Sequence, residues 1–178
     1  QYFRKPAVYM KLPSQGIGYP EGTIDMPPNG EIPIYPMTAL DEITARTPDA
    51  LFNGSAIAEI IRSCVPNIKN AWDMPVIDLN STLVAIKIAS TGHNMEIESA
   101  CPACQETNDF ELDLRNVLSQ QTVPDYHKSI KHGDLEIYFK PMTYKNLNDN
   151  NQKQFEEQRM LQAASNPDQN EDEKLNIL

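Results

Sequence analysis

The sequence predicts an α+β fold in which small antiparallel hairpins, one carrying a zinc-ribbon-like Cys-x-x-Cys knuckle, pack with several short helices. Two patterns carry this prediction. Apolar and acidic residues alternate on both sides of Cys101-Pro102-Ala103-Cys104, as is typical of half-buried antiparallel strands. Residues Ser55–Cys64 instead repeat apolar side chains at helical spacing. With 178 residues, the chain is long enough for one domain with extensions.

The composition excludes several classes of protein. A formal net charge of −10 opposes general electrostatic binding to nucleic acid or to an anionic membrane, and favours solubility or a basic protein partner. Three cysteines argue against a disulfide framework and for reduced thiols. Neither a long apolar run for a membrane span nor the apolar region of a secretory signal is present.

Three regions are expected along the chain. Residues 1–22 form an extended N-terminal arm, residues 23–145 a compact α+β domain, and residues 146–178 a helical, partly loose acidic C-terminal tail. The arm is either a floppy terminus or a segment that packs on its own domain or on a neighbouring subunit. Its aromatic residues Tyr2, Phe3 and Tyr9 are costly to leave in water, so they are candidate interaction residues.

The first elements of the domain follow from turn and capping residues. Residues Gly22–Tyr35 predict a hairpin about Asn29-Gly30, with Pro33 making its second strand an edge. Thr38 is expected to cap a short helix that ends before Pro48, in a Thr-x-x-Asp pattern that resembles a capping box.

Two longer helices are expected next. In residues 55–64 an apolar stripe at i, i+3, i+4 and i+7 ends at Cys64, which therefore points into the core. Residues 78–89 favour a second helix that stops at Gly92, although the β-branched run Val84–Ile88 leaves a strand as the alternative.

The second half of the sequence predicts two hairpins and a last helix. In the hairpin around the knuckle, Met95 and Ile97 on one strand and Phe110 and Leu112 on the other offer an apolar face for a core. Residues 115–126 are a polar connector, residues 127–140 a hairpin that turns at His132-Gly133-Asp134, and a helix follows Thr143. The end, residues 164–178, is a solvated tail or a partner-docking helix that orders on assembly.

A metal site is one interpretation of Cys101 and Cys104, because their spacing is that of half a structural zinc site. Such a site needs four ligands, and the sequence has no second Cys-x-x-Cys. Candidate further ligands are Cys64 and His93, with His127 and His132 as other histidines. A knuckle that folds without metal and a metal site shared between subunits are the alternatives. Zinc is therefore the one candidate cofactor.

No motif for a nucleophile, a phosphate-binding loop or a metalloprotease helix occurs, so we expect a protein that is not an enzyme. Trp72, the single tryptophan, is typical of a core or interface anchor. Together with Phe155 in the last helix, it joins the candidate interaction residues.

A series of segments in fixed order resembles one known family. The series runs LPSQGIGYPEG, NGEIPIYPMTALDEI, PDALFNGSAIAEIIRSCV, a helix that begins at Asp78, then Thr91-Gly92-His93 and Cys-Pro-Ala-Cys. In order and spacing it is similar to the baseplate hub family of T-even-type contractile-tailed bacteriophages. The resemblance covers about residues 12–115.

This resemblance implies a non-enzymatic structural component of the virion, located in the central hub of the tail baseplate and present in several copies. Its partners would be other baseplate, hub and tail-tube proteins, with neither nucleic acid nor membrane, and it would assemble in the cytoplasm of the bacterial host. A transient baseplate assembly chaperone and a zinc-binding regulatory module are the alternatives.

Overall fold

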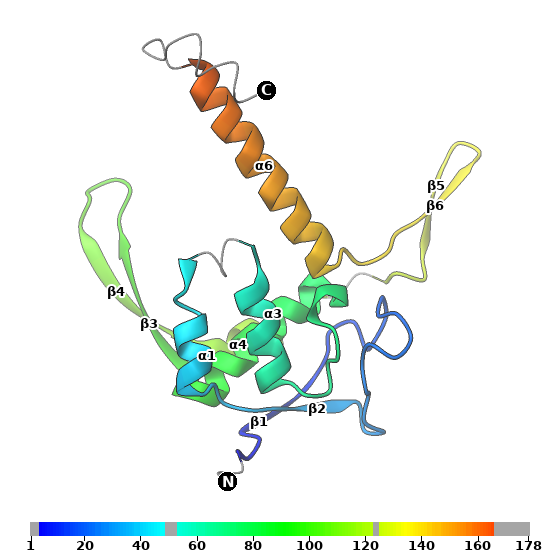
Figure 1. Ribbon diagram of the computed structural model, residues 1–178, viewed down its shortest axis with the longest axis horizontal. Helices are drawn as coiled ribbons and strands as arrows, with labels where there is room; N and C mark the ends of the chain where they lie inside the picture. The colour runs from blue at the N-terminus through cyan, green and yellow to red at the C-terminus, as the bar shows by residue number, and fades with distance from the viewer. Residues whose placement is uncertain (1–3, 49–52, 123–124, 166–178) are drawn as a thin grey trace.

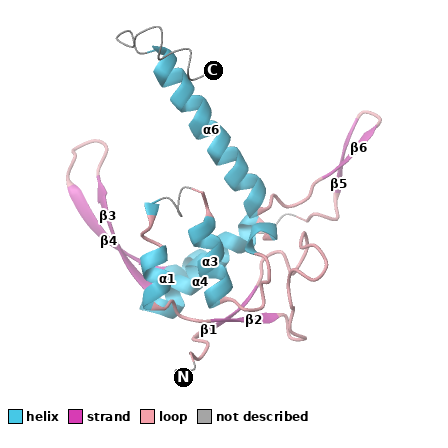
Figure 2. Ribbon diagram, viewed as in Figure 1, coloured by secondary structure: helices cyan, strands magenta, loops and turns pink. Residues whose placement is uncertain are grey.

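The computed structural model describes residues 4–48, 53–122 and 125–165 (Figure 1). A central body contains the helices α1 (Ala39–Thr44), α3 (Ser55–Cys64) and α4 (Val76–Thr91) beside a two-stranded sheet of β1 (Val8–Lys11) and β2 (Glu31–Ile34). Three elements extend away from this body: the hairpin of β3 (Asn94–Ala100) and β4 (Thr107–Asp113), the hairpin of β5 (Ser129–His132) and β6 (Leu135–Tyr138), and the helix α6 (Tyr144–Ser165) (Figures 1 and 2).

The core lies among β1–β2, α3, α4 and the first turn of α6. The expected helix at Ser55–Cys64 is confirmed, and its apolar stripe places Cys64 at 0% exposure. The second helix is confirmed against the strand alternative, but it begins at Val76 rather than at Asp78. The buried cluster consists of Leu12, Ile32, Ile34, Ile60, Ile61, Cys64, Val65, Ile68, Ala71, Met74, Leu79, Ala85, Ile86 and Tyr144.

The predicted hairpin over Gly22–Tyr35 is wrong in its pairing. The turn itself forms, since the Gly30 amide donates to the Pro27 carbonyl at 2.9 Å. However, β2 pairs antiparallel with β1 of the N-terminal segment, while Ile24 bridges to Ile68. Two consecutive prolines before the turn lack the N–H groups that a local ladder would need, so β2 pairs with a strand from an earlier part of the chain.

The knuckle hairpin is confirmed in its strands, but not in its packing. Met95 pairs with Leu112, and Ile97 with Phe110. We expected this apolar face to meet a core, yet none of these four side chains belongs to the buried cluster or packs against it. The hairpin continues outward beyond the end of α4, and no other described element forms a layer against its apolar face (Figure 1).

The remaining elements follow the sequence more closely. The hairpin expected over residues 127–140 forms as β5–β6, and the connector after β4 holds the short helix α5 (Leu114–Ser119). Thr38 caps α1 in a capping box with Asp41. The α+β class with small antiparallel hairpins and short helices is thus confirmed. Within the described residues, no helix combines the length and the apolar character that crossing a membrane requires.

Candidate functional site

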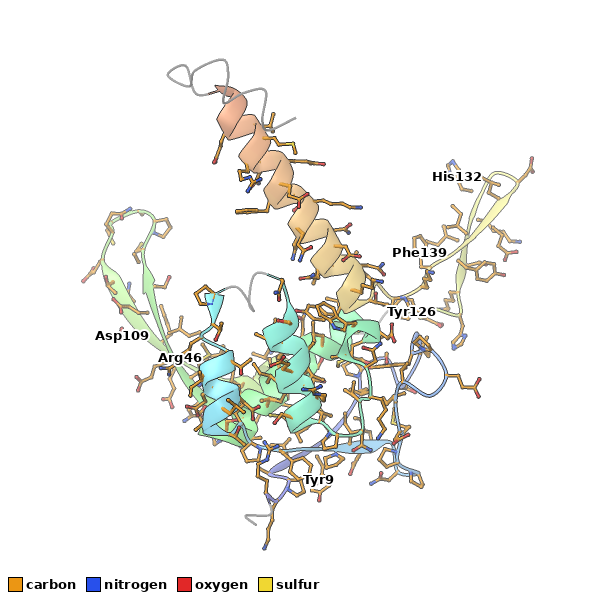
Figure 3. The ribbon with its side chains drawn as sticks, in the orientation of Figure 1. Tyr9, Arg46, Asp109, Tyr126, His132 and Phe139 are labelled. Carbon is orange, nitrogen blue, oxygen red and sulfur yellow. The ribbon has the colours of Figure 1, made fainter. Side chains whose placement is uncertain are left out.

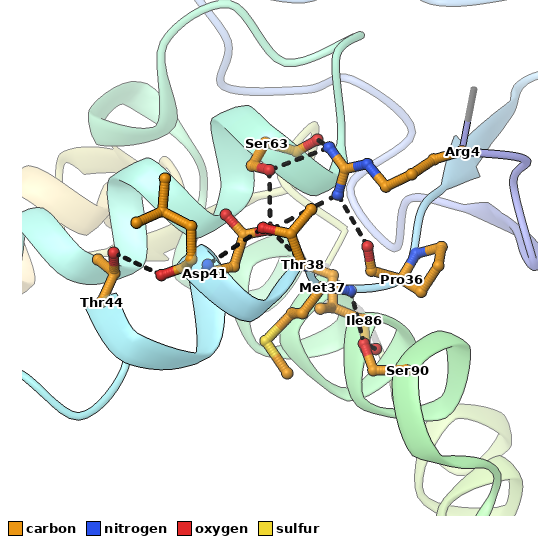
Figure 4. Close-up of polar contacts among 10 residues, drawn as sticks. Arg4, Pro36, Met37, Thr38, Asp41, Thr44, Ser63, Ile86 and Ser90 are labelled. Carbon is orange, nitrogen blue, oxygen red and sulfur yellow. Dashed lines mark hydrogen bonds and ion pairs between the residues drawn. The ribbon is translucent and has the colours of Figure 1, made fainter. Parts of the chain in front are cut away.

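Arg4 fastens the N-terminal segment across α1 and α3 (Figure 4). Its guanidinium donates to the Pro36 carbonyl at 2.8 Å and to the Ser63 carbonyl at 2.8 Å. It also lies 3.5 Å from the carboxylate of Asp41, which accepts hydrogen bonds from the Thr38 amide and hydroxyl and from the Ser63 hydroxyl. Burial raises the pKa of Asp41, but the hydrogen bonds and the nearby guanidinium outweigh it, so this pKa lies below its ordinary value.

A second polar anchor lies deeper, where Ser14 meets the first turn of α4. The carboxylate of Asp78 is 0% exposed and accepts hydrogen bonds from both the amide and the hydroxyl of Ser14. Burial raises the pKa of Asp78 despite these bonds. The same burial, with the Asp78 charge nearby, raises the pKa of Tyr19. Through these two hydrogen bonds, the carboxylate holds the N-terminal segment on α4.

The first turn of α6 docks on the body through an aromatic pair. Trp72, in the short helix η1 (Ala71–Asp73), stacks on Tyr144 with ring centroids 4.9 Å apart and planes inclined by 8°. The Tyr144 hydroxyl donates to the Gly54 carbonyl at 2.8 Å. Backbone bonds from Val76 to Met142 and from Tyr144 to Met74 complete the attachment. Trp72 therefore acts as an anchor within the chain, and α6 leaves the body from this point.

The candidate metal ligands are not brought together. Cys101 and Cys104 lie at the outer end of the β3–β4 hairpin, His93 at its base, and Cys64 in the core. Among the described residues, no three His, Cys, Asp or Glu side chains are grouped so that they could hold a metal ion. The Cys101 pKa is nevertheless lowered by the amides of Cys104 and Ala103, and Gln105 takes the left-handed conformation, with φ 61°, that closes the turn.

Most large exposed apolar side chains lie on the elements that leave the body (Figure 3), although Leu40 and Ile43 of α1 are exposed as well. On β3–β4, Met95 is 39% and Phe110 57% exposed. On β5–β6 and the residues after it, the exposed set is larger. It comprises Ile130, Leu135, Ile137, Tyr138, Phe139 and Met142. Met160 and Leu161 are exposed on the outer part of α6. Exposed apolar side chains grouped on one element in this way make these elements candidate contact surfaces.

The structure places the predicted interaction residues unequally. Tyr2 and Phe3 lie outside the described residues. Tyr9 is 61% exposed on β1 and points away from the body (Figure 3). Phe155 is 49% exposed on α6. Trp72 is half-buried on Tyr144. The apolar faces of the two hairpins are the surfaces that sequence reasoning did not assign. The sequence predicts both hairpins, but it was interpreted as giving a core-facing surface only in β3–β4.

Comparison with known proteins adds the family. No curated protein and no solved structure matches the chain. A family model, described as T4 bacteriophage base plate protein, matches residues 20–173, which include both hairpins, α6 and the body except for β1. This match agrees, at the level of a phage baseplate protein, with the resemblance drawn from the order of the sequence segments. The chain belongs to the family of T4 bacteriophage base plate proteins.

Proposed function

We propose that the chain is a non-enzymatic structural component of a contractile-tail phage baseplate, located in its central hub, where several copies join other baseplate and tail-tube proteins. One observation carries this proposal: apolar side chains that a core would bury are displayed instead on the elements that project from a small body. Because the chain belongs to a family of phage base plate proteins, the phage baseplate is the assembly that such a component would join.

Physical chemistry explains why these projections need neighbours. An isolated two-stranded hairpin is only marginally stable in water, and neither projecting hairpin shares a sheet with a third strand in the described residues. Fully burying a large apolar side chain contributes about 1.5–3 kcal/mol. Contact with neighbouring subunits would therefore both stabilise the hairpins and hold the chain in the assembly.

The charge supports protein partners over nucleic acid. A chain with a net charge of −10 is repelled by a phosphate backbone, so a position in the tail among proteins suits it better than contact with the genome. The cysteines of the described residues are free thiols, as suits assembly in the reducing cytoplasm of a bacterial host.

The β5–β6 hairpin offers a matched pair of variants for the test. Ile130 faces Ile137 across the two strands, and the next pair, Lys131 and Glu136, lies on the opposite face. In a phage that lacks its own copy of the gene, we expect Ile130→Ser with Ile137→Ser to block incorporation into tails. Lys131→Ser with Glu136→Ser should leave incorporation intact.

The measurement is the number of copies of the chain in purified tails, determined by quantitative mass spectrometry. Several copies per tail, retained after washing in high salt, are expected. A chain that is required for assembly but missing from finished tails would contradict the structural role and favour a transient assembly chaperone. Stoichiometric zinc in the purified chain, with loss of the fold on chelation, would favour a zinc-binding regulatory module.

A further inference from the structure

The β3–β4 hairpin separates two kinds of side chain onto its two faces. Met95, Ile97, Phe110 and Leu112 share one face, because cross-strand partners in this register point the same way. The opposite face carries carboxylates. Glu96 lies across from Glu111, and Glu98 across from Asp109.

The carboxylate face is unfavourable for the hairpin on its own. Like charges directly opposite each other in a sheet are destabilising, and here two such pairs are adjacent. Residues 94–113 contain no Lys or Arg, and six acidic residues lie within them: Glu96, Glu98, Glu106, Asp109, Glu111 and Asp113. Of these, Asp113 pairs with Arg115 at the base of the hairpin, at 2.6 Å.

We propose, on the basis of the baseplate role above, that the apolar face of β3–β4 docks on a baseplate subunit other than this chain. The contact surface of that subunit is apolar and bordered by Lys and Arg. The apolar face supplies the area to be buried, since among the described residues none of its four side chains packs on the core, and Met95 and Phe110 are exposed. Charge complementarity then selects the partner. A protein surface that covers one face of a two-stranded ribbon lies within about 10 Å of the carboxylates on the other face. This distance is one Debye length, so the charges on the two sides still interact.

A groove supports contact with positive side chains. A hollow of about 630 Å³ runs along the middle of the hairpin, lined by its four paired carboxylates and by Ile97 and Phe110. Long basic side chains at the border of a partner seated on the apolar face would extend around the edge of the ribbon toward these carboxylates.

A second copy of this chain is a poor occupant. The β3–β4 hairpin of each copy carries six carboxylates and no Lys or Arg. Two hairpins packed face to face would therefore bring both sets of carboxylates together without a compensating positive charge. Like-charge juxtaposition of this kind suppresses association. The carboxylates therefore disfavour association of the hairpin with a second copy and favour a partner whose surface carries Lys and Arg.

The test places the photo-reactive p-benzoylphenylalanine at Phe110 in the full chain, expressed during infection, and irradiates the cells while tails assemble. The adjacent position Glu111, on the opposite face of β4, is the matched control. Mass spectrometry identifies the cross-linked peptides. We expect position 110 to cross-link to another baseplate protein, at an apolar site flanked by Lys or Arg, with several-fold higher yield than position 111. Cross-links to a second copy or to an acidic surface, or no cross-link, would overturn the proposal.

A charge-neutral variant tests the choice of partner separately. Glu96→Gln, Glu98→Gln, Asp109→Asn and Glu111→Gln together remove the cross-strand repulsion and leave the apolar face intact. The isolated variant should resist urea at least as well as the parent, whereas its cross-link yield at position 110 should fall several-fold. An unchanged or higher yield would overturn the basic partner. If the chain is incorporated into tails normally but gives no cross-link, this inference alone is contradicted. If the chain is absent from tails and from their assembly intermediates, the proposed function is contradicted as well.

Discussion

The amide of Ser14 donates to one carboxylate oxygen of Asp78 at 2.8 Å, and the Ser14 hydroxyl donates to the other, across 64 residues of sequence. Both residues are buried, at 1% and 0% exposure. With Arg4, which reaches the carbonyl groups of Pro36 and Ser63, this contact fastens the N-terminal segment to three helices of the body. The described part of this segment therefore packs on its own domain.

Ser14→Ala should lower the free energy of unfolding by about 1.5–3 kcal/mol, the range for hydrogen bonds to charged groups. The reason is that the buried carboxylate of Asp78 loses a donor and gains no water in exchange. Urea unfolding measures the change. Ser119→Ala is the control, because the Ser119 hydroxyl bonds an exposed carbonyl, and its cost should stay within about 0.5 kcal/mol. Equal losses of unfolding free energy in the two variants would show that the buried Ser14–Asp78 contact stabilises the fold no more than an exposed hydrogen bond does.

Asp41→Asn should cost about 1–2 kcal/mol at neutral pH, because it weakens the capping box and the bond to Ser63. The folded-state pKa of Asp41 lies below its unfolded value of about 3.9, so its contribution to stability is complete above that value and is lost as pH falls through the folded pKa. The difference between parent and variant should therefore shrink on acidification below about pH 4. Urea unfolding at several pH values measures this difference, with exposed Glu42→Gln as the control. A difference that does not change with pH would contradict a lowered pKa for Asp41.

Gly54→Ala should detach the first turn of α6. A Cβ at this position would lie 2.5 Å from Asn148 Oδ1 and 2.7 Å from the Tyr144 hydroxyl, and φ is already 79°. Gly22 has the same φ with nothing within 4 Å, so Gly22→Ala measures the backbone strain alone, about 1–2 kcal/mol. Gly54→Ala should cost about 1–3 kcal/mol more, from overpacking. Fluorescence of Trp72 follows the loss, since it stacks on Tyr144. Equal costs for the two variants would mean that α6 does not depend on this contact.

Cys101 should react with iodoacetamide at lower pH than an ordinary thiol of pKa about 8.5, because the amides of Cys104 and Ala103 lower its pKa. Cys64 should resist modification until the chain unfolds, since it is 0% exposed and burial raises its pKa. Peptide mass spectrometry across a pH series gives both rates. Cys104→Ala keeps the amides, so most of the effect should remain. If the pH profile of the Cys101 reaction rate is centred at or above the ordinary thiol pKa, the turn geometry is refuted.

Local chemistry explains which parts of the fold could be predicted from the sequence. The Thr38–Asp41 capping box and the stripe that buries Ile60, Ile61 and Cys64 depend on residues within two turns of a helix, and both formed as expected. The pairing of Ile97 with Phe110 likewise follows from alternation on either side of a tight turn. Neighbours in sequence decide such features.

Long-range choices could not be predicted in this way. The partner of β2 is β1, more than twenty residues earlier, because the prolines before Asn29-Gly30 leave a local partner without ladder donors. The meeting of Trp72, Tyr144 and Gly54 joins three segments that no local pattern links. Which pairings win depends on the total area that the core buries, and this is a property of the whole chain.

The sequence by itself determined the helices, the two projecting hairpins, the knuckle and the family signature, since each rests on periodicity, capping or turn residues. Only the tertiary structure decided that the apolar faces of β3–β4 and β5–β6 stay exposed and that Cys101 and Cys104 lie apart from the other candidate ligands in the described residues. Periodicity tells which side chains share a face. Whether another layer covers that face depends on where the rest of the chain packs, and here the body closes without the hairpins.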